Sequence, residues 1–387
     1  MQKKLLATVV ASLVAGQAMA LEVVNDGTNK LTIGGRIGIQ TETKDGKTSA
    51  DNDSARINFG FEHKLSETMT GFAKAEWGYK AHNEYTSENG ETKADDLFSN
   101  RLGYVGLKHS QYGAVAAGKQ WSVYSDVANW TDEFAIGGGA AMGQYNGFTD
   151  DGGFSGTGRA DNAFTYRGEF AGLKVGAQYQ LRGESYKKDD SNVADTADNI
   201  KRKHGYQLAA SYTLDMGLSF GGTYSETSFE RGLANEQSSN LKSKAAVAAV
   251  KYDMNDIYVA ATYGQFRNHT SAHLGKNAAT SDGNMGLDQK SEGIELYGRY
   301  KLSQVLDGGI SLQAGWNQLK VKDDNRGNSS DAKIDKMMLG AIYEVGPMQF
   351  AAEYTWDKSK SFDKVENGKN VYKDADNYFN LQARYYF

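Results

Sequence analysis

The sequence has no cysteine, so disulfides cannot stabilise the protein. Proline is almost absent as well: Pro347 stands alone against 45 glycines and 23 tyrosines. Few prolines leave the hydrogen-bond ladders of strands unbroken. A composition rich in tyrosine, glycine and threonine suits strands with bends better than helices. Both shortages therefore indicate a β-rich protein that is stabilised without cross-links.

Long apolar runs are also missing. After residue 20 no stretch of about 18 apolar residues occurs, which excludes a membrane-spanning helix. The mean hydropathy of −0.61 would by itself suggest a soluble chain. A transmembrane β-barrel is the membrane structure compatible with that average, because only every second residue of its strands need be apolar.

The first twenty residues form a predicted secretory signal peptide. Lys3 and Lys4 precede the apolar run LLATVVASLVAG, and small residues follow at 18–20. We expect residues 1–20 to be removed and residues 21–387 to fold as a single domain. An uncleaved membrane anchor is the alternative, but no stop-transfer run follows. Removing the two lysines lowers the net charge from −5 to −7, which disfavours nucleic acid as a partner.

Apolar and polar residues alternate at the end of the chain. In NYFNLQARYYF one parity is apolar and the other largely polar: Phe379, Leu381, Ala383, Tyr385 and Phe387 against Asn380, Gln382, Arg384 and Tyr386. Successive side chains of a strand point to opposite faces, so this stretch is a strand with one apolar face. The same pattern recurs in LTIGGRIGIQ (31–40) and in the runs 73–80, 173–182 and 349–356.

The connections between such runs alternate in length. Short turns are predicted at 66–69, 110–113, 171–172, 215–217, 255–257, 303–309 and 345–347, and long loops after residue 43 and at 82–96, 124–160, 184–203, 230–241, 269–289, 324–333 and 361–376. This predicts an all-β fold, a 16-stranded antiparallel transmembrane β-barrel with short turns at one rim. Such a barrel encloses an aqueous channel. A soluble sandwich or propeller is the alternative, but its central strands should be apolar on both faces.

A transmembrane barrel must close, since unpaired backbone in hydrocarbon is costly. We therefore expect the first strand, near 31–43, to pair with the last, near 376–387. The chain then ends inside its closing strand, and Tyr385 and Phe387 join the aromatic girdle at the membrane boundary.

Five arginines are candidates for the pore. Alternation places Arg36, Arg56 and Arg101 on the lumen face of neighbouring strands, and Arg159 and Arg167 flank the start of the sixth strand. Inward cations that lie close together repel each other and are tolerable only in water or opposite acids. We expect them to form one wall of a constriction; the alternative is solvated lumen residues without a role in selectivity.

The longest loop, 124–160, supplies the acids. It carries Asp126, Asp132 and Glu133 between glycine-rich segments and is far too long for a simple turn. If this third loop folds into the lumen, its carboxylates face the arginines and set a transverse field across a narrowed aperture. Such a field would orient dipolar solutes and penalise apolar ones, as charged walls do in ion-selective pores.

Several stretches together resemble the general diffusion porins of Gram-negative outer membranes, in particular their marine vibrio–photobacterium branch. They are LTIGGRIGIQ, ARINFGFEH, NRLGYVGLK, YGAVAAGKQWSVYSDV, NAFTYRGEFAGLKVGAQYQ and the terminal ARYYF. The resemblance implies a sixteen-stranded homotrimer in the cell outer membrane with an inward-folded third loop. It also implies a ladder of basic lumen residues at Arg36, Arg56, Arg101 and Arg159, and a loop acid at Asp132.

The resemblance further implies partners. The terminal Phe387 is read by the outer-membrane assembly machinery, and the outer face meets lipid and lipopolysaccharide. The sequence departs from the family at the loop tip, where TDEFAIGGG lacks the family's proline and has Ile136 where the family glutamate falls. The second constriction acid is therefore open, with Glu133 as a substitute from a shifted position.

We therefore expect a passive, water-filled channel for small hydrophilic solutes and ions, with no cofactor, no metal and no enzymatic activity. His269 and His273 in HTSAH have metal-like spacing but no third ligand nearby. A barrel hydrolase needs a Ser–His or Asp–His constellation, and the six histidines form no such motif. A sugar-specific porin needs an aromatic slide along the lumen, whereas the tyrosines fall largely on the lipid parity. An adhesive barrel is the remaining alternative.

Overall fold

The computed structural model describes residues 20–79, 85–88, 91–94, 98–145, 151–183, 185–187, 199–232, 238–271, 287–302, 307–323, 330–366 and 369–387. The predicted signal peptide lies outside these residues except for Ala20. No helix in this part of the chain is long and apolar enough to cross a membrane.

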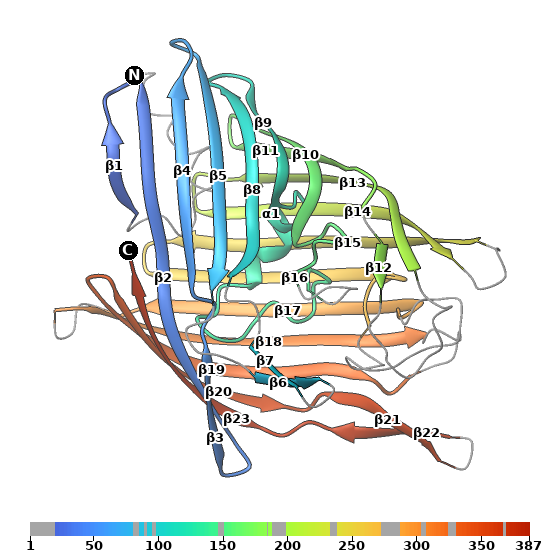
Figure 1. Ribbon diagram of the computed structural model, residues 1–387. Helices are drawn as coiled ribbons and strands as arrows, with labels where there is room; N and C mark the ends of the chain where they lie inside the picture. Colours follow the sequence, from blue (N-terminus) through green and yellow to red (C-terminus); the bar gives the residue numbers. More distant parts are fainter. Residues whose placement is uncertain are drawn as a thin grey trace.

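Sixteen strands of the described chain form one closed antiparallel barrel (Figure 1). They are β2 (Asn29–Lys44), β4 (Arg56–Lys64), β5 (Met69–Tyr79), β8 (Phe98–His109), β9 (Gly113–Trp121), β10 (Arg159–Phe170), β11 (Leu173–Gln180), β13 (Asn199–Thr213), β14 (Leu218–Gly232), β15 (Ser238–Met254), β16 (Ile257–Arg267), β17 (Lys290–Lys301), β18 (Gly309–Asp323), β19 (Lys333–Val345), β20 (Met348–Asp357) and β23 (Tyr378–Tyr386). Each strand pairs with the next in this series, and β23 pairs with β2. The predicted fold class is confirmed.

The walls of the barrel cross in Figure 1, where β2, β4, β5 and β8 run steeply and β13 to β20 run across them. Strand tilt of this kind is required to close a sheet into a barrel. Loop 3, defined here as residues 122–158 between β9 and β10, begins with two short helices, α1 (Ser125–Ala128) and η2 (Asn129–Thr131). Figure 1 draws α1 between the two walls, so loop 3 enters the barrel.

Seven short strands in the described residues extend the barrel sheet or form hairpins in its long loops: β1 (Leu21–Asn25), β3 (Lys47–Asn52), β6 (Tyr85–Glu88), β7 (Glu91–Ala94), β12 (Ser185–Lys187), β21 (Lys360–Glu366) and β22 (Lys369–Asp374). Several predicted loops contain strands and need correction. The stretch 82–96 holds the hairpin of β6 and β7, and 184–203 holds β12 and the start of β13. The stretch 361–376 holds the hairpin of β21 and β22. The loop 230–241 shrinks to 233–237, because β14 and β15 stay paired to its edge. Alternation does not reveal such extensions, since both faces of a hairpin that projects into water are polar.

Exposure along the strands is inverted relative to a soluble protein. On β23, Leu381 is 49% exposed on the outer face, whereas its neighbour Gln382 is 4% exposed. Tyr385 is also exposed on the outer face. Soluble proteins bury large apolar side chains and expose polar ones. The reverse arrangement is the one required when lipid lies outside and water inside.

The connection lengths agree with the sequence pattern. The short connections all lie at one rim, because they join successive antiparallel strands: 65–68, 110–112, 171–172, 214–217, 255–256, 302–308 and 346–347. The other rim carries the long connections, of which loop 3 is one; the exception is 233–237, which is short because β14 and β15 remain paired up to it.

The barrel closes through the two ends of the chain. β23 pairs with β2 over residues 36–44 of β2. Phe387 continues this ladder: its N–H donates to Gly35 O (3.1 Å), and its own O accepts from Gly35 N–H (2.8 Å). β1 then occupies the same edge of β2, with Leu21 opposite Ile33. The expected pairing of the first and last strands is confirmed. β1, which the sequence pattern did not predict, continues along the same edge of β2.

Replacing Gly35 by alanine should impair closure. A Cβ at Gly35 would lie 2.3 Å from Arg56 O and 2.7 Å from Phe387 Cζ. A paired backbone oxygen cannot move aside without breaking the ladder, and such overpacking costs about 1–3 kcal/mol. We expect a lower melting temperature of the folded barrel, measured by its mobility shift in unheated gel electrophoresis. Gly103→Ala is the matched control, because a Cβ at Gly103 meets nothing within 4 Å; an equal loss in both variants would contradict the prediction.

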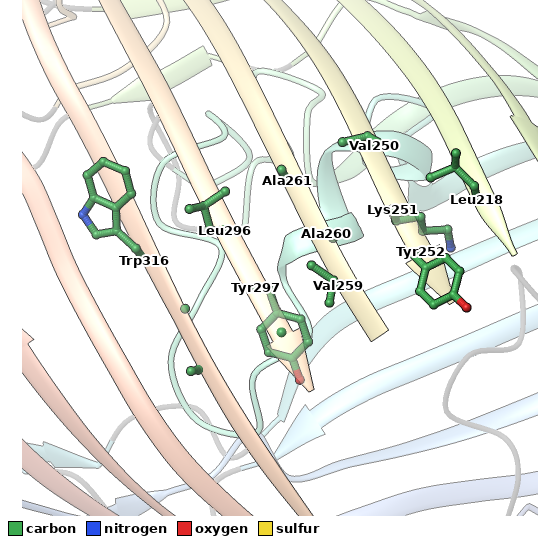
Figure 2. Close-up of a pocket in the computed structure, with 13 residues that line it drawn as sticks. Leu218, Val250, Lys251, Tyr252, Val259, Ala260, Ala261, Leu296, Tyr297 and Trp316 are labelled. Atoms are coloured by element: carbon green, nitrogen blue, oxygen red, sulfur yellow. The ribbon is translucent and has the colours of Figure 1, made fainter. Parts of the chain in front are cut away.

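A shallow apolar groove of about 470 Å³ crosses the outer face over β14 to β18 (Figure 2). Leu218, Tyr252 and Trp316 are bulky residues along it, whereas Ala261 and Gly298 are small. A Cβ added at Gly298 would meet nothing within 4 Å, so the groove opens to the surroundings of the barrel. An apolar lining at this place fits contact with lipid chains better than contact with water.

Candidate constriction site

Five adjacent strands each contribute one charged side chain to the inner wall. In order around the barrel they are Arg384 on β23, Arg36 on β2, Arg56 on β4, Glu76 on β5 and Arg101 on β8. Glu76 lies between two arginines: its Oε1 is 2.8 Å from Arg101 Nε and 3.7 Å from Arg56 Nη1. We call the four arginines the arginine row. Three of them are predicted site residues, and Arg384 is an addition.

A second acid and one backbone carbonyl support the arginine row. Arg384 forms a bidentate ion pair with Asp53, with Nη2 2.8 Å from Oδ1. Ser54 has a φ of 44°, and its carbonyl O accepts from Arg36 Nε (3.2 Å) and Arg56 Nε (3.3 Å). Like charges this close need such partners or water. With Glu76 and Asp53 counted, the four arginines keep a net charge of about +2 at neutral pH.

Arg159 lies farther along the wall and shares a different acid. Its guanidinium stacks over Trp121 at 5.7 Å, and its Nε is 4.0 Å from Asp151 Oδ2. Lys119 Nζ is 3.0 Å from the same oxygen. Burial opposes ionisation of Asp151, but the Gly153 N–H and the Lys119 ammonium outweigh it and hold the pKa of Asp151 below its ordinary value. The Asp151 carboxylate of loop 3 thus lies close to two cations of the inner wall, Lys119 and Arg159.

Arg167 and Asp126, both predicted site residues, pair with each other. Arg167 Nε is 2.7 Å from Asp126 Oδ2, and Arg167 Nη2 is 3.1 Å from Asp126 Oδ1. The same Nη2 donates to Trp121 O (2.9 Å). A bidentate pair of this kind has a fixed geometry. It fastens the start of loop 3 to β10, and the two charges compensate each other.

Loop 3 follows the inner wall because wall side chains bind its backbone. Gln178 Oε1 on β11 accepts from Val123 N–H (3.1 Å), and Tyr258 OH on β16 donates to Trp130 O (2.6 Å). Apolar residues of α1 and η2 pack beside these bonds, with Val127 among them. An irregular segment must satisfy its buried backbone groups somewhere, and here the wall does so.

Two buried carboxylates hold the tip of loop 3. Glu295 on β17 accepts from Thr131 Oγ1 (2.5 Å) and from Ala141 N–H (2.6 Å). Glu353 on β20 accepts from Gly137 N–H (3.0 Å). Neither carboxylate is more than 1% exposed. Gln382 on β23 also donates to Ala135 O (2.9 Å), so loop 3 runs along the wall from β11 as far as β23 before it returns to β10.

A tyrosine links Asp132 to arginines of the inner wall. Asp132 Oδ2 is 3.4 Å from the hydroxyl of Tyr145, on the returning limb of loop 3. Tyr145 is in turn within electrostatic range of Arg159 and Arg101. Burial and the adjacent Glu133 raise the pKa of Asp132 to about 6, against the opposing hydrogen bond from Tyr145. Asp132 is thus an acid that titrates near neutral pH at the inner edge of loop 3.

Glu133 lies beside a different group of cations. Its Oε2 is 4.0 Å from Arg299 Nη1 on β17, and Lys251 on β15 is also in electrostatic range. Lys251 Nζ sits 5.0 Å over the ring of Trp130, and Arg299 Cζ sits 5.7 Å over the ring of Tyr258. The structure thus places two of the three predicted loop acids, Asp132 and Glu133, beside different cations.

Sequence reasoning missed Arg384, Glu76 and Asp53. A signal existed for Arg384 and Glu76, because both lie on the polar parity of strands adjacent to the predicted arginines. Asp53 lies between β3 and β4, where alternation gives no signal. The anchors Glu295 and Glu353 also lie on polar parities, but nothing in the sequence connects them to loop 3.

The histidine pair considered as a metal site has another explanation. No group of three metal-binding side chains was found in the described part of the chain. His269 is buried and hydrogen-bonded to Ser243 and Gly143. His273 lies outside the described residues.

Comparison with known sequences points to one family. The family described as Gram-negative porin matches residues 7–387. Outer membrane porin F of Xenorhabdus nematophila is 31% identical over 350 residues, which covers 89% of each chain. Outer membrane protein S2 of Salmonella typhi is 29% identical over 396 residues, covering 97% of this chain and 96% of that protein.

Solved structures share the fold. Salmonella typhi OmpF in complex with daunomycin superimposes with a TM-score of 0.68 at 22% identity, covering 95% of this chain and 100% of that one. The trimer form of Vibrio cholerae OmpT gives a TM-score of 0.61 at 15% identity, covering 93% and 100%. The closed barrel, its inverted exposure and the match along nearly the whole sequence agree: the chain belongs to the family of Gram-negative porins, non-enzymatic β-barrels of the outer membrane.

Proposed function

We propose that this porin conducts small hydrophilic solutes and ions passively through a charged constriction formed by the arginine row and loop 3. The observation that carries the proposal is the arginine row itself, four guanidinium groups on four of five adjacent strands, which pair with two carboxylates among the described residues. Fixed charges that line an aqueous lumen act on every ion that passes. The channel needs no cofactor and no energy coupling.

The predicted site residues divide into two roles in this proposal. Arg36, Arg56 and Arg101 act with Arg384 on permeating anions, and Asp132 supplies the opposing negative charge. The remaining predicted residues serve mainly to position loop 3 or to balance local charge: Arg159, Arg167, Asp126 and Glu133. The arginine row favours anions, whereas the net charge of −7 expected for the chain without its signal peptide favours cations.

Planar lipid bilayers test the proposal directly. The purified protein should give ohmic conductance steps, and the reversal potential in a KCl gradient reports the sign of the selectivity. Three equal closing steps are expected, since we propose that three copies assemble as a homotrimer with three pores. Absence of conductance from folded protein would refute the proposed function.

Lowering the pH from 8 to 5 should shift selectivity toward anions through Asp132. Because the pKa of Asp132 is about 6, its carboxyl is ionised at pH 8 and protonated at pH 5. The aperture therefore loses one negative charge when the pH is lowered. One charge about 8 Å from a permeating ion in salt should change the permeability ratio roughly twofold. Reversal potentials at the two pH values measure this step. Asp132→Asn should reduce this step, because residue 132 then no longer changes its charge over this pH range; an unchanged step in that variant would assign it to other groups.

Export and assembly complete the proposal. Residues 1–20 act as a signal peptide that is removed, and residues 21–387 fold as one domain. The terminal Phe387, with Tyr385 beside it in the closing strand, serves as the signal for the outer-membrane assembly machinery. Lipid and lipopolysaccharide surround the outer face. Placement in the marine vibrio–photobacterium branch remains a prediction.

A solute-specific porin is the competing function. It would show saturable block of the single-channel current by its solute, whereas a general channel would not. The aromatic side chains of Trp130, Tyr258 and Tyr297 on the inner side are buried against loop 3, which leaves little of their surface for a sugar.

A further inference from the structure

His269 is buried where the connection after β16 meets loop 3. The residue is 2% exposed and stacks on Phe266, with ring centroids 5.9 Å apart. Its Nε2 lies 2.6 Å from Gly143 O, and its Nδ1 lies 2.7 Å from Ser243 Oγ on β15. A carbonyl oxygen can only accept, so Nε2 carries the proton and donates to Gly143. Nδ1 then accepts from the Ser243 hydroxyl, which defines one neutral tautomer; burial lowers the pKa of His269 to about 4 and keeps that form at neutral pH.

The loop backbone is pressed closely against this ring. Gly143 has a φ of 69°, and a Cβ there would lie 2.8 Å from Phe266 Cε1 and 2.9 Å from His269 Cδ2. The position therefore requires glycine on two grounds, conformation and space. Thr157 Oγ1 also donates to Gly143 O (3.1 Å), and Tyr124 OH donates to the preceding carbonyl of Met142 (2.7 Å). Those two donors belong to loop 3 itself, whereas His269 belongs to the barrel.

The connection that carries His269 is itself fixed at its base. Asn268 N–H donates to Gln289 O (3.2 Å), and Asp288 N–H donates to Thr270 O (2.6 Å). Asp288 also accepts from Thr270 Oγ1 (2.7 Å). His269 thus projects toward loop 3 from a short paired segment that continues β16 and β17.

We propose that His269 is a positioning residue of the constriction: it fixes the returning limb of loop 3 at Gly143 and thereby places Tyr145 beside Asp132. Gly143 precedes Tyr145 by two residues, and the Tyr145 hydroxyl donates to Asp132 while lying within electrostatic range of Arg159 and Arg101. The inference rests on the proposed function of the constriction. It gives a role to a histidine that spacing alone would suggest for metal binding.

Bilayer recordings on the full-length protein test the role of His269. His269→Ala should shift the K⁺/Cl⁻ permeability ratio toward anions about twofold, as Asp132→Asn does, and should make closure occur at lower voltage. His269→Gln should restore both properties, because the glutamine amide can donate to Gly143 O while its oxygen accepts from Ser243. His204→Ala is the matched control, since His204 stacks on Tyr179 away from loop 3 and should have no effect.

A double substitution shows whether His269 acts through Asp132. His269→Ala combined with Asp132→Asn should shift selectivity no further than Asp132→Asn alone, whereas independent effects would multiply. Additive shifts, an inert His269→Ala or a failure of glutamine to rescue would each overturn the inference. Where His269→Ala does not fold, Ser243→Ala should give a smaller shift of the same sign, and no shift would likewise overturn it. A wild-type protein that does not conduct refutes the proposed function instead.

Discussion

Replacing Arg36 and Arg101 together by alanine should raise the permeability of K⁺ relative to Cl⁻ about fivefold. A unit charge about 8 Å from a permeating ion in water contributes about 0.5 kcal/mol, with opposite sign for the two ions. Two charges therefore change the difference between the ions by about 2 kcal/mol, which screening in 0.1 M salt reduces to about 1 kcal/mol. That energy corresponds to about a fivefold change in the ratio.

The arginine row supplies both the reason and an internal check. The double substitution removes the net positive charge that Glu76 and Asp53 leave uncompensated. Glu76→Gln should lower the permeability of K⁺ relative to Cl⁻, because it removes the negative charge that compensates Arg56 and Arg101. Reversal potentials in a KCl gradient measure both variants, and the effects should shrink at high salt.

The matched control is Lys242→Ala. Lys242 pairs with Glu226 at 2.8 Å, and both lie on the outward parity of their strands. Its removal alters the net charge of the protein but not the field in the lumen. A shift as large as that of the double variant would mean that overall charge sets the selectivity, and no shift in the double variant would remove Arg36 and Arg101 from the site.

Glu295→Ala should release the tip of loop 3 and make the pore close at lower voltage. The substitution leaves the Ala141 N–H without its buried acceptor and leaves the Thr131 hydroxyl only its 3.1 Å contact with Thr262 Oγ1. Each unsatisfied buried donor costs about 1–3 kcal/mol, which is comparable to the stability of a loop attachment. We also expect noisier open-channel current, because a loosened loop samples more positions.

Two further variants serve as controls for Glu295→Ala. Glu295→Gln keeps an oxygen acceptor and should cause a smaller change than alanine. Glu292→Ala, on the same strand, removes an outward carboxylate that pairs with Lys322 at 3.1 Å and should leave closure unchanged. Equal closure voltages in wild type and Glu295→Ala would show that Glu295 does not hold the loop.

The barrel strands were largely predictable, and the segments outside the membrane were not. Period-two alternation located the closing strand at 376–387 and its partner at 31–43, close to the ladder between β23 and β2. The same rule failed for β1 and for the hairpin of β21 and β22. Alternation arises from contact with lipid on one face and water on the other. Where both faces meet water, that signal disappears.

The constriction was predictable only in part. Arg36, Arg56 and Arg101 could be assigned to the lumen because side-chain direction in a strand is a local property. Arg384 has the same direction, yet its partner Asp53 is 331 positions away in sequence. Asp126 could be expected on an inward loop, but its pairing with Arg167 depends on where β10 passes the start of loop 3.

The sequence by itself determined that a polar inner face and an apolar outer face would close into a water-filled barrel, and that arginines would line it. Only the tertiary structure decided which charges meet. Closure of the sheet brings β23, β2, β4, β5 and β8 side by side, and the path of loop 3 follows from polar groups spread over strands far apart in sequence. The physical reason is that polarity acts residue by residue, whereas electrostatic partnership depends on strand order, register and tilt in three dimensions.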